Sequence, residues 1–164
     1  LLISLLLFGP EAVKARMYSL ADMTDWTFQA RIFLWEGGWN IFKDHPLTGC
    51  GFKCVDLIHS QYPDPSGYIA RFRGMHSNLF QLLVDTGIVG LAAWLSIWAT
   101  YLTVIYKTIQ SANENSKGFA MGAVAAVLGF LAGGVFETNF YDSEIVMLLY
   151  FIMGISLAQT NHKS

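Results

Sequence analysis

Three long apolar runs in the second half of the chain restrict what it can fold into. They cover residues 87–106, 118–136 and 145–158. A helix needs roughly 20 apolar residues to cross the hydrocarbon core of a bilayer, and the third run approaches that length when it is extended to 143–160. The chain is also 54% hydrophobic and only 13% charged, unlike a water-soluble domain. The sequence therefore predicts an all-α protein, a polytopic transmembrane helical bundle.

A fourth, shorter apolar run opens the sequence at residues 1–8. It has no basic flank before it and no A-x-A-like cleavage site after it, so a signal peptide is the less favoured interpretation. We expect this run to be the remainder of a transmembrane helix, with further spans preceding it.

The distribution of lysines predicts how the chain is oriented. The polar loop 107–117 begins and ends with lysine, and Lys163 follows the last span. By the positive-inside rule, this loop and the C-terminus lie in the cytoplasm. Residues 9–86 and the acidic connection 137–143 then lie on the outer side of the membrane. The long extracytoplasmic loop 9–86 is where we expect the chemistry.

Within this loop, residues 25–44 are predicted to form an amphipathic helix that ends before Pro46. Its large apolar residues recur at helical spacing and share one face: Phe28, Ile32, Trp35, Trp39 and Phe42. Such a face either packs on other parts of the protein or lies in the membrane interface. The sequence leaves both alternatives open.

Several classes of function have no support in the sequence. The net charge of −2 gives no basic face for nucleic acid. The two cysteines, Cys50 and Cys54, are a weak metal signal, and whether they pair is left open. There is no Gly-rich phosphate loop, no H-E-x-x-H, no G-x-S-x-G and no D-x-D motif. We therefore expect a mechanism without metal or cofactor.

His76 opens the apolar run HSNLFQLLVDTGIVG. If this run is one continuous helix, His76 shares a face with Gly87 and Gly90. The two glycines would let a neighbouring membrane helix pack closely, and His76 would lie at the outer end of the span. A histidine there suits a general base that acts on a lipid-linked substrate. From position alone, a histidine that only binds a loop is the commoner alternative.

Arg31 borders the aromatic face of the predicted helix, within one turn of Trp35. Its planar guanidinium suits a phosphate or pyrophosphate, which it can bind with two parallel hydrogen bonds. The alternative is an arginine whose stem covers apolar surface while its charge stays in water.

Further candidates lie close to His76. Arg71 and Arg73 precede it, and Asn78 follows it. We group these three with Trp35 as candidate substrate-binding residues. Three acidic residues at the outer ends of the last two spans are candidates for orienting an imidazole: Glu137, Asp142 and Glu144.

Taken in order, these features resemble the O-antigen ligase and polymerase superfamily. An arginine begins an aromatic helix (RIFLWEGGWNIF), a Pro-x-x-Gly-x-Gly turn follows (in HPLTGCGF), and His76 precedes Gly87 and Gly90 at the family's spacing. The resemblance covers residues 24–158. It implies an enzyme that moves a glycan from an undecaprenyl-diphosphate carrier to lipid A core, to another glycan or to a protein hydroxyl, without metal or nucleotide.

The resemblance also implies roles for two residues. His76 matches the family's essential histidine, proposed to activate the acceptor hydroxyl, and Arg31 matches an arginine that holds the donor's pyrophosphate. The family has a second essential arginine on an earlier outer loop, so we expect this segment alone to be inactive. The expected partners are the undecaprenyl-diphosphate-linked glycan, lipid A core or another glycan acceptor, and membrane lipid.

Three rival interpretations remain. A repeat-unit polymerase would use the same site on a different acceptor. A transporter resembling inorganic-carbon carriers would place ionisable residues inside its spans, and the three predicted spans contain none. A structural scaffold would leave the clustered histidine and arginines of the outer loop without a purpose.

Overall fold

The structure is a computed structural model, and it describes residues 10–11, 25–62, 64–111 and 113–161. The apolar run 1–8 lies outside the described residues. Within the described ranges, the elements from residue 25 onward are all helical: α3 (Trp26–Asp44), α4 (Val55–Ile58), η1 (His59–Gln61), α5 (Tyr68–Phe72), α6 (Asn78–Ser111), α7 (Glu114–Gly133), η2 (Asn139–Tyr141) and α8 (Ser143–Asn161).

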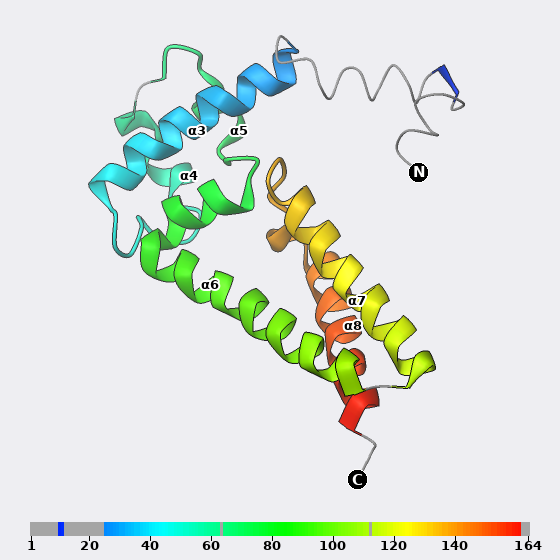
Figure 1. Ribbon diagram of the computed structural model, residues 1–164. Coiled ribbons are helices and arrows are strands. Elements are labelled where there is room, and N and C mark those ends of the chain that lie inside the picture. The colour runs from blue at the N-terminus through cyan, green and yellow to red at the C-terminus, as the bar shows by residue number, and fades with distance from the viewer. Residues whose placement is uncertain (1–9, 12–24, 63, 112, 162–164) are drawn as a thin grey trace.

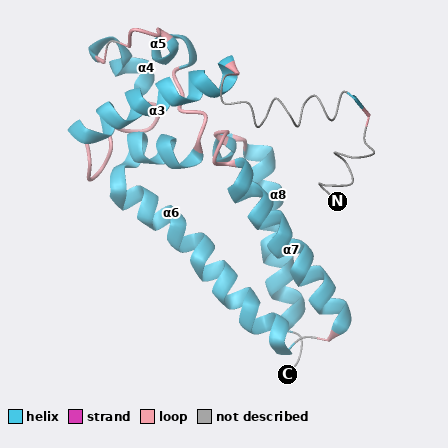
Figure 2. Ribbon diagram, turned by 45° about the horizontal axis from the view of Figure 1, so that its top comes forward, coloured by secondary structure: helices cyan, strands magenta, loops and turns pink. Residues whose placement is uncertain are grey.

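The helices form two regions that share α6 (Figures 1 and 2). We divide them at Gly87, where the helical geometry of α6 is interrupted. We call residues 25–86 the cap and residues 88–161 the bundle. The bundle consists of the long part of α6 with α7 and α8, which run side by side and converge with α6 at the end near the C-terminus. The cap contains α3, α4, α5 and the first turns of α6, and it lies at the opposite end.

The bundle has apolar residues both inside and outside. Its core is Trp98, Tyr101, Ile105, Ala120, Val127, Phe130, Leu149 and Met153. Large apolar side chains also cover its outer surface, among them Ile97, Leu128, Met147 and Phe151. Two helical segments, Asn78–Gln110 and Ser116–Gly133, are long and apolar enough to cross a membrane, and Ser143–Ala158 is a shorter apolar helix. This outer surface suits lipid rather than water as its solvent.

Helix α3 begins at its N-cap Asp25, whose carboxylate accepts a 2.7 Å hydrogen bond from the amide of Thr27. The side that is buried is not the predicted aromatic face but the row Ala30, Leu34, Gly38 and Ile41. Small residues explain the difference, because Gly37 and Gly38 let neighbouring side chains come close. A Cβ on Gly38 would lie only 2.5 Å from the sulfur of Met75. Trp39, on the predicted face, is 48% exposed.

The condition for a face shared by His76, Gly87 and Gly90, one continuous helix, is not met. Helix α6 starts at Asn78, and Gly87 interrupts it with φ 64° and ψ −165°. The backbone of the loop 46–51 fills the interruption. Four hydrogen bonds join this loop to α6: Cys50 N to Val84 O at 2.9 Å, Gly51 N to Asp85 O at 3.0 Å, Ile88 N to Pro46 O at 2.9 Å, and Val89 N to Leu47 O at 3.2 Å.

The predicted helix-packing role of Gly87 and Gly90 is corrected accordingly. A Cβ on Gly87 would lie 2.4 Å from the carbonyl of Leu47, so the close neighbour is the loop and not another helix. A Cβ on Gly90 would overlap the side chain of Thr86 in its own helix. Opposite Gly87, Gly49 also has a positive φ, of 66°, which glycine adopts at little cost.

The structure also answers the question about the two cysteines. Cys50 and Cys54 form a disulfide, with their Cα atoms 5.7 Å apart. The bond closes the loop immediately after its contact with α6.

Candidate functional site

His76 lies where the cap contacts the bundle, two residues before α6 begins. Its backbone is in the left-handed region, with φ 46°, and its side chain is 36% exposed. The ring Nδ1 is 3.1 Å from Oε1 of Glu137, and the ring of Phe72 packs edge-on at 5.6 Å. A carboxylate only accepts hydrogen bonds, so Nδ1 carries the proton. The other nitrogen, Nε2, is then the basic one in neutral His76.

The residues on both sides of His76 are fixed by hydrogen bonds. The carbonyl of Met75 accepts a 2.9 Å hydrogen bond from Nε1 of Trp35. The backbone amide of Met75 donates to Oε1 of Gln81 at 2.9 Å. The amide of Ser77 donates to the hydroxyl of Thr138 at 3.2 Å. A non-glycine residue with positive φ costs roughly 1–2 kcal/mol, and these contacts hold His76 in that conformation.

Glu137 reaches His76 from the loop that follows α7, and Asn78 holds this loop in place. Asn78 donates from its amide to Gly134 O at 2.7 Å and from Nδ2 to Oδ1 of Asn139 at 2.6 Å. Its Oδ1 accepts from the amide of Phe140 at 3.4 Å. Asn78, predicted to bind substrate, is buried, and its polar atoms bond to the loop after α7. Of the three predicted acidic residues, only Glu137 contacts His76.

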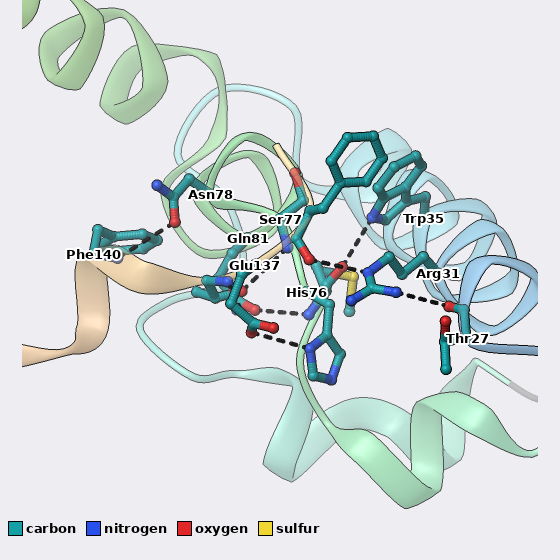
Figure 3. A network of polar contacts seen from close by, with 12 residues as sticks. Thr27, Arg31, Trp35, His76, Ser77, Asn78, Gln81, Glu137 and Phe140 are labelled. Carbon is teal, nitrogen blue, oxygen red and sulfur yellow. Dashed lines mark hydrogen bonds and ion pairs between the residues drawn. The ribbon is translucent and has the colours of Figure 1, made fainter. Parts of the chain in front are cut away.

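Arg31 approaches the same place from α3. Its Nε donates to the carbonyl of Phe136 at 3.0 Å, and a terminal nitrogen donates to Thr27 O at 3.0 Å. Arg31, His76 and Glu137 thus converge from three separate segments (Figure 3). They line one cavity of about 150 Å³, whose other walls are Trp26, Thr27, Ala30, Leu34 and Phe72. Two of the five guanidinium N–H groups make these bonds, which leaves donors for a ligand.

The remaining predicted residues are placed differently. Arg71 is exposed and lies over the ring of Phe72 at 5.3 Å, and it lines neither this cavity nor the neighbouring one. Trp35 stacks on Phe80 at 5.1 Å, and its N–H donates to the carbonyl of Met75. Arg73 lines the neighbouring cavity.

That neighbouring cavity has a volume of about 280 Å³ and a polar lining. It shares Phe72, His76 and Glu137 with the first cavity, and its remaining walls are Lys53, Asp56, Arg73, Gly74, Gln81, Thr138 and Tyr141. Sequence reasoning missed Lys53, which is far in sequence from every predicted site residue, and Tyr141, which was passed over although it precedes the candidate Asp142. The pair Lys53 and Asp56 within the loop after Pro46 was the available signal.

The hydroxyl of Tyr141 donates to Asp85, a buried carboxylate that also accepts from Nε2 of Gln81 at 3.1 Å. Burial and the bond to Asp85 raise the pKa of Tyr141 well above its ordinary value, so the phenol stays neutral. The sequence placed Asp85 in the outer loop, whereas the structure places it inside α6, which begins earlier than the predicted span.

A third cavity, of about 330 Å³, lies between α3 and the segment 61–69. It contains none of the predicted site residues, and its walls include Glu36, Asn40 and Asp64.

The family model for O-antigen ligase matches residues 1–95, which is more than half of the chain and includes Arg31, His76, Gly87 and Gly90. The chain therefore belongs to the O-antigen ligase family. Members of this family are membrane enzymes of the ligase or polymerase type, and their substrates are lipid-linked glycans and acceptors. No curated protein and no solved structure matches the chain.

Proposed function

We propose that this chain carries catalytic groups of a ligase that transfers a glycan from an undecaprenyl-diphosphate-linked donor to an acceptor hydroxyl, such as one on lipid A core, at the periplasmic membrane face. One observation carries the proposal. Arg31 and the His76–Glu137 pair line a single cavity, so a cation for a diphosphate and a base for a hydroxyl are side by side.

In this mechanism Nε2 of His76 takes the proton of the acceptor hydroxyl. The acceptor oxygen then bonds to the anomeric carbon of the donor, and the bond from that carbon to the diphosphate oxygen breaks. The undecaprenyl diphosphate leaves with the electron pair, and Arg31 stabilises its charge. Glu137 holds Nδ1–H and stabilises the imidazolium that forms. A single displacement of this kind needs no covalent intermediate.

The test measures transfer of a polyprenyl-diphosphate-linked glycan in membranes that contain the intact protein. His76→Ala is expected to reduce transfer by about 10²- to 10⁴-fold, the usual contribution of a general base. The matched control is His59→Ala, because the ring of His59 bonds only to carbonyls of its own helical turn, Val55 O and Asp56 O. Full transfer by folded His76→Ala would remove the base from the mechanism.

Arg31 has its own pair of variants. Arg31→Ala is expected to abolish donor use, and Arg31→Lys to restore only part of it, because an ammonium lacks the planar two-pronged geometry. Lys43→Ala is the control, since Lys43 is an exposed cation on the same helix and lines neither site cavity. An Arg31→Ala enzyme with an unchanged donor KM contradicts diphosphate binding at this residue.

A further inference from the structure

The two cavities beside His76 differ in chemistry although they share a wall of Phe72, His76 and Glu137. The cavity with Arg31 is otherwise mainly apolar, since Trp26, Ala30 and Leu34 line it. The walls of the other cavity have two cations (Lys53 and Arg73), two carboxylates (Asp56 and Glu137) and hydroxyl groups. Glu137 is engaged with His76. A base that faces both cavities has one place for each of two different substrates.

The two cations of the second cavity are not neutralised by close ion pairs. The ammonium of Lys53 lies 5.4 Å above the ring of Tyr141 and 5.8 Å from that of Phe52, and no described carboxylate lies within ion-pair distance of it. Arg73 is 4.0 Å from Asp56, with both side chains about half exposed. Such an exposed pair at the limit of contact is weak, so an anionic ligand can compete for both cations.

Backbone strain is concentrated around this same cavity. Among the described residues, three non-glycine residues have a positive φ: Lys53 at 53°, Arg73 at 52° and His76 at 46°. All three line the second cavity. Strained conformations of non-glycine residues persist where the surrounding structure holds them and cluster at binding and catalytic sites. Here they aim two cations and the proposed base at one volume.

We propose that this second cavity is the acceptor subsite and that it binds a sugar ring whose phosphate or carboxylate substituent contacts Lys53 and Arg73. The inference rests on the proposed function of His76. At about 280 Å³ the cavity lies just below the roughly 300–1,000 Å³ of sites for drug-sized ligands, which suits one ring rather than a chain. The hydroxyl that is glycosylated then points toward the shared wall at His76.

Binding is tested on the intact protein in lipid nanodiscs by calorimetric titration with glucose, glucose 6-phosphate and glucuronate. The two anionic sugars are expected to bind at least tenfold more tightly than glucose. A preference between them identifies phosphate or carboxylate as the substituent. Equal binding of all three sugars, or of none, overturns the proposal.

The variants are chosen so that misfolding does not explain a loss. Lys53→Gly and Arg73→Gly remove the charges and also relieve the positive φ, so each is expected to fold at least as well as wild type while losing the anionic preference about tenfold. Lys53→Arg keeps the charge and is expected to retain it. Lys43→Gln is the control outside the cavity. Retained preference in both glycine variants contradicts the assignment.

Kinetics separate this proposal from the function on which it rests. With an anionic acceptor, Lys53→Gly is expected to raise the acceptor KM about tenfold and to leave the donor KM unchanged. A raised donor KM instead assigns the cavity to the donor and overturns the inference. If His76→Ala abolishes transfer while Lys53→Gly does nothing, the acceptor subsite fails and the ligase mechanism stands.

Discussion

The bundle and the cap are both helical, but different physical terms specify them. In the bundle, apolar residues fill the core and also cover the outer surface, so hydropathy predicts where the helices are. The cap also has an apolar core, which includes Leu34, Ile41, Val55, Ile69 and Met75, but close backbone approach decides its arrangement. The comparison teaches that hydropathy locates membrane helices, whereas glycine positions and loop hydrogen bonds build the site.

The largest effect is expected where the two regions join. Gly87→Ala forces a left-handed φ on alanine and places a Cβ 2.4 Å from the carbonyl of Leu47, so we expect a loss of about 3 kcal/mol in unfolding free energy. Thermal unfolding of the intact protein in detergent measures it. Gly118→Ala is the matched control in the bundle, where nothing lies within 4 Å of the new atom, and it is expected to stabilise by about 0.5–1 kcal/mol.

If Gly87→Ala and Gly118→Ala change the unfolding free energy equally, the backbone conformation at Gly87 does not determine how the two regions join. Opening of the loop 46–51 in the Gly87 variant, seen as faster amide exchange at Cys50 and Gly51, is the local result expected.

A second pair of variants tests whether water surrounds the cap and lipid surrounds the bundle. Leu34→Ala in the cap core is expected to cost about 2–3 kcal/mol, in the lower part of the range for a buried leucine, because the transfer free energy of the removed atoms is lost and a cavity is left behind. Leu149→Ala in the bundle core is expected to cost about 1 kcal/mol, because lipid tails are as apolar as the core and only packing is lost. Denaturant unfolding in detergent micelles compares the two. Equal losses imply that water, not lipid, surrounds the bundle.

A third, smaller effect concerns Asp64, which caps the turn before α5. Its carboxylate accepts bonds from the amides of Ser66 and Ile69 at 2.9 and 3.1 Å. Burial alone would raise the pKa of Asp64, but the hydrogen bonds from Ser66 and Ile69 outweigh it and hold the pKa below its ordinary value. Asp64→Ala is expected to destabilise the turn by about 1 kcal/mol, as loss of a helix cap does.

The sign of the pH dependence follows from that lowered pKa. The stabilisation by Asp64 is complete above its unfolded pKa of about 3.9 and is lost as the pH falls through the folded value. The protection factors for amide exchange of residues 66–72, corrected for the intrinsic pH dependence of exchange, are therefore expected to fall at acid pH in wild type, whereas Asp64→Asn, which keeps an acceptor without a charge, loses that pH dependence. An unchanged profile in Asp64→Asn refutes the assignment.

The smallest effect is expected at the far end of the bundle. Lys117 and Glu114 form an exposed pair at 3.0 Å, and exposed pairs contribute little. Glu114→Gln is expected to change stability by less than about 0.5 kcal/mol in the same unfolding experiment. A larger loss would mean that this end of the bundle is specified by charge, contrary to the comparison.

Part of the fold could be predicted from sequence, because long apolar runs commonly form membrane-spanning helices. The all-α class follows from them, and the helix predicted at 25–44 coincides with α3 within one residue. Which face of α3 is buried was not accessible, because it depends on Ile69 and Met75, which approach Gly37 and Gly38 from other elements. Periodicity describes one helix and contains no information about its neighbours.

The site shows the same limit. Sequence selected Arg31 and His76 from a family pattern, and it named Glu137 among three acidic candidates without a way to choose. Glu137 can be selected only when the position of the loop after α7 is known, and the hydrogen bonds of Asn78 to Gly134 and Asn139 set that position. Lys53 and Asp56 marked their loop as charged, but the position of Lys53 beside His76 could not be predicted, because it depends on a left-handed backbone after Gly51.

The backbone contact between the loop 46–51 and α6 has a consequence for how this protein can vary. The side chain of Leu47 is 65% exposed and takes no part in the four hydrogen bonds across the break, so substitutions there leave the contact intact. A single inserted or deleted residue would shift every donor past its acceptor. Across homologues, the residue types at Leu47 and Thr48 should therefore vary freely, whereas the number of residues in this turn should stay constant.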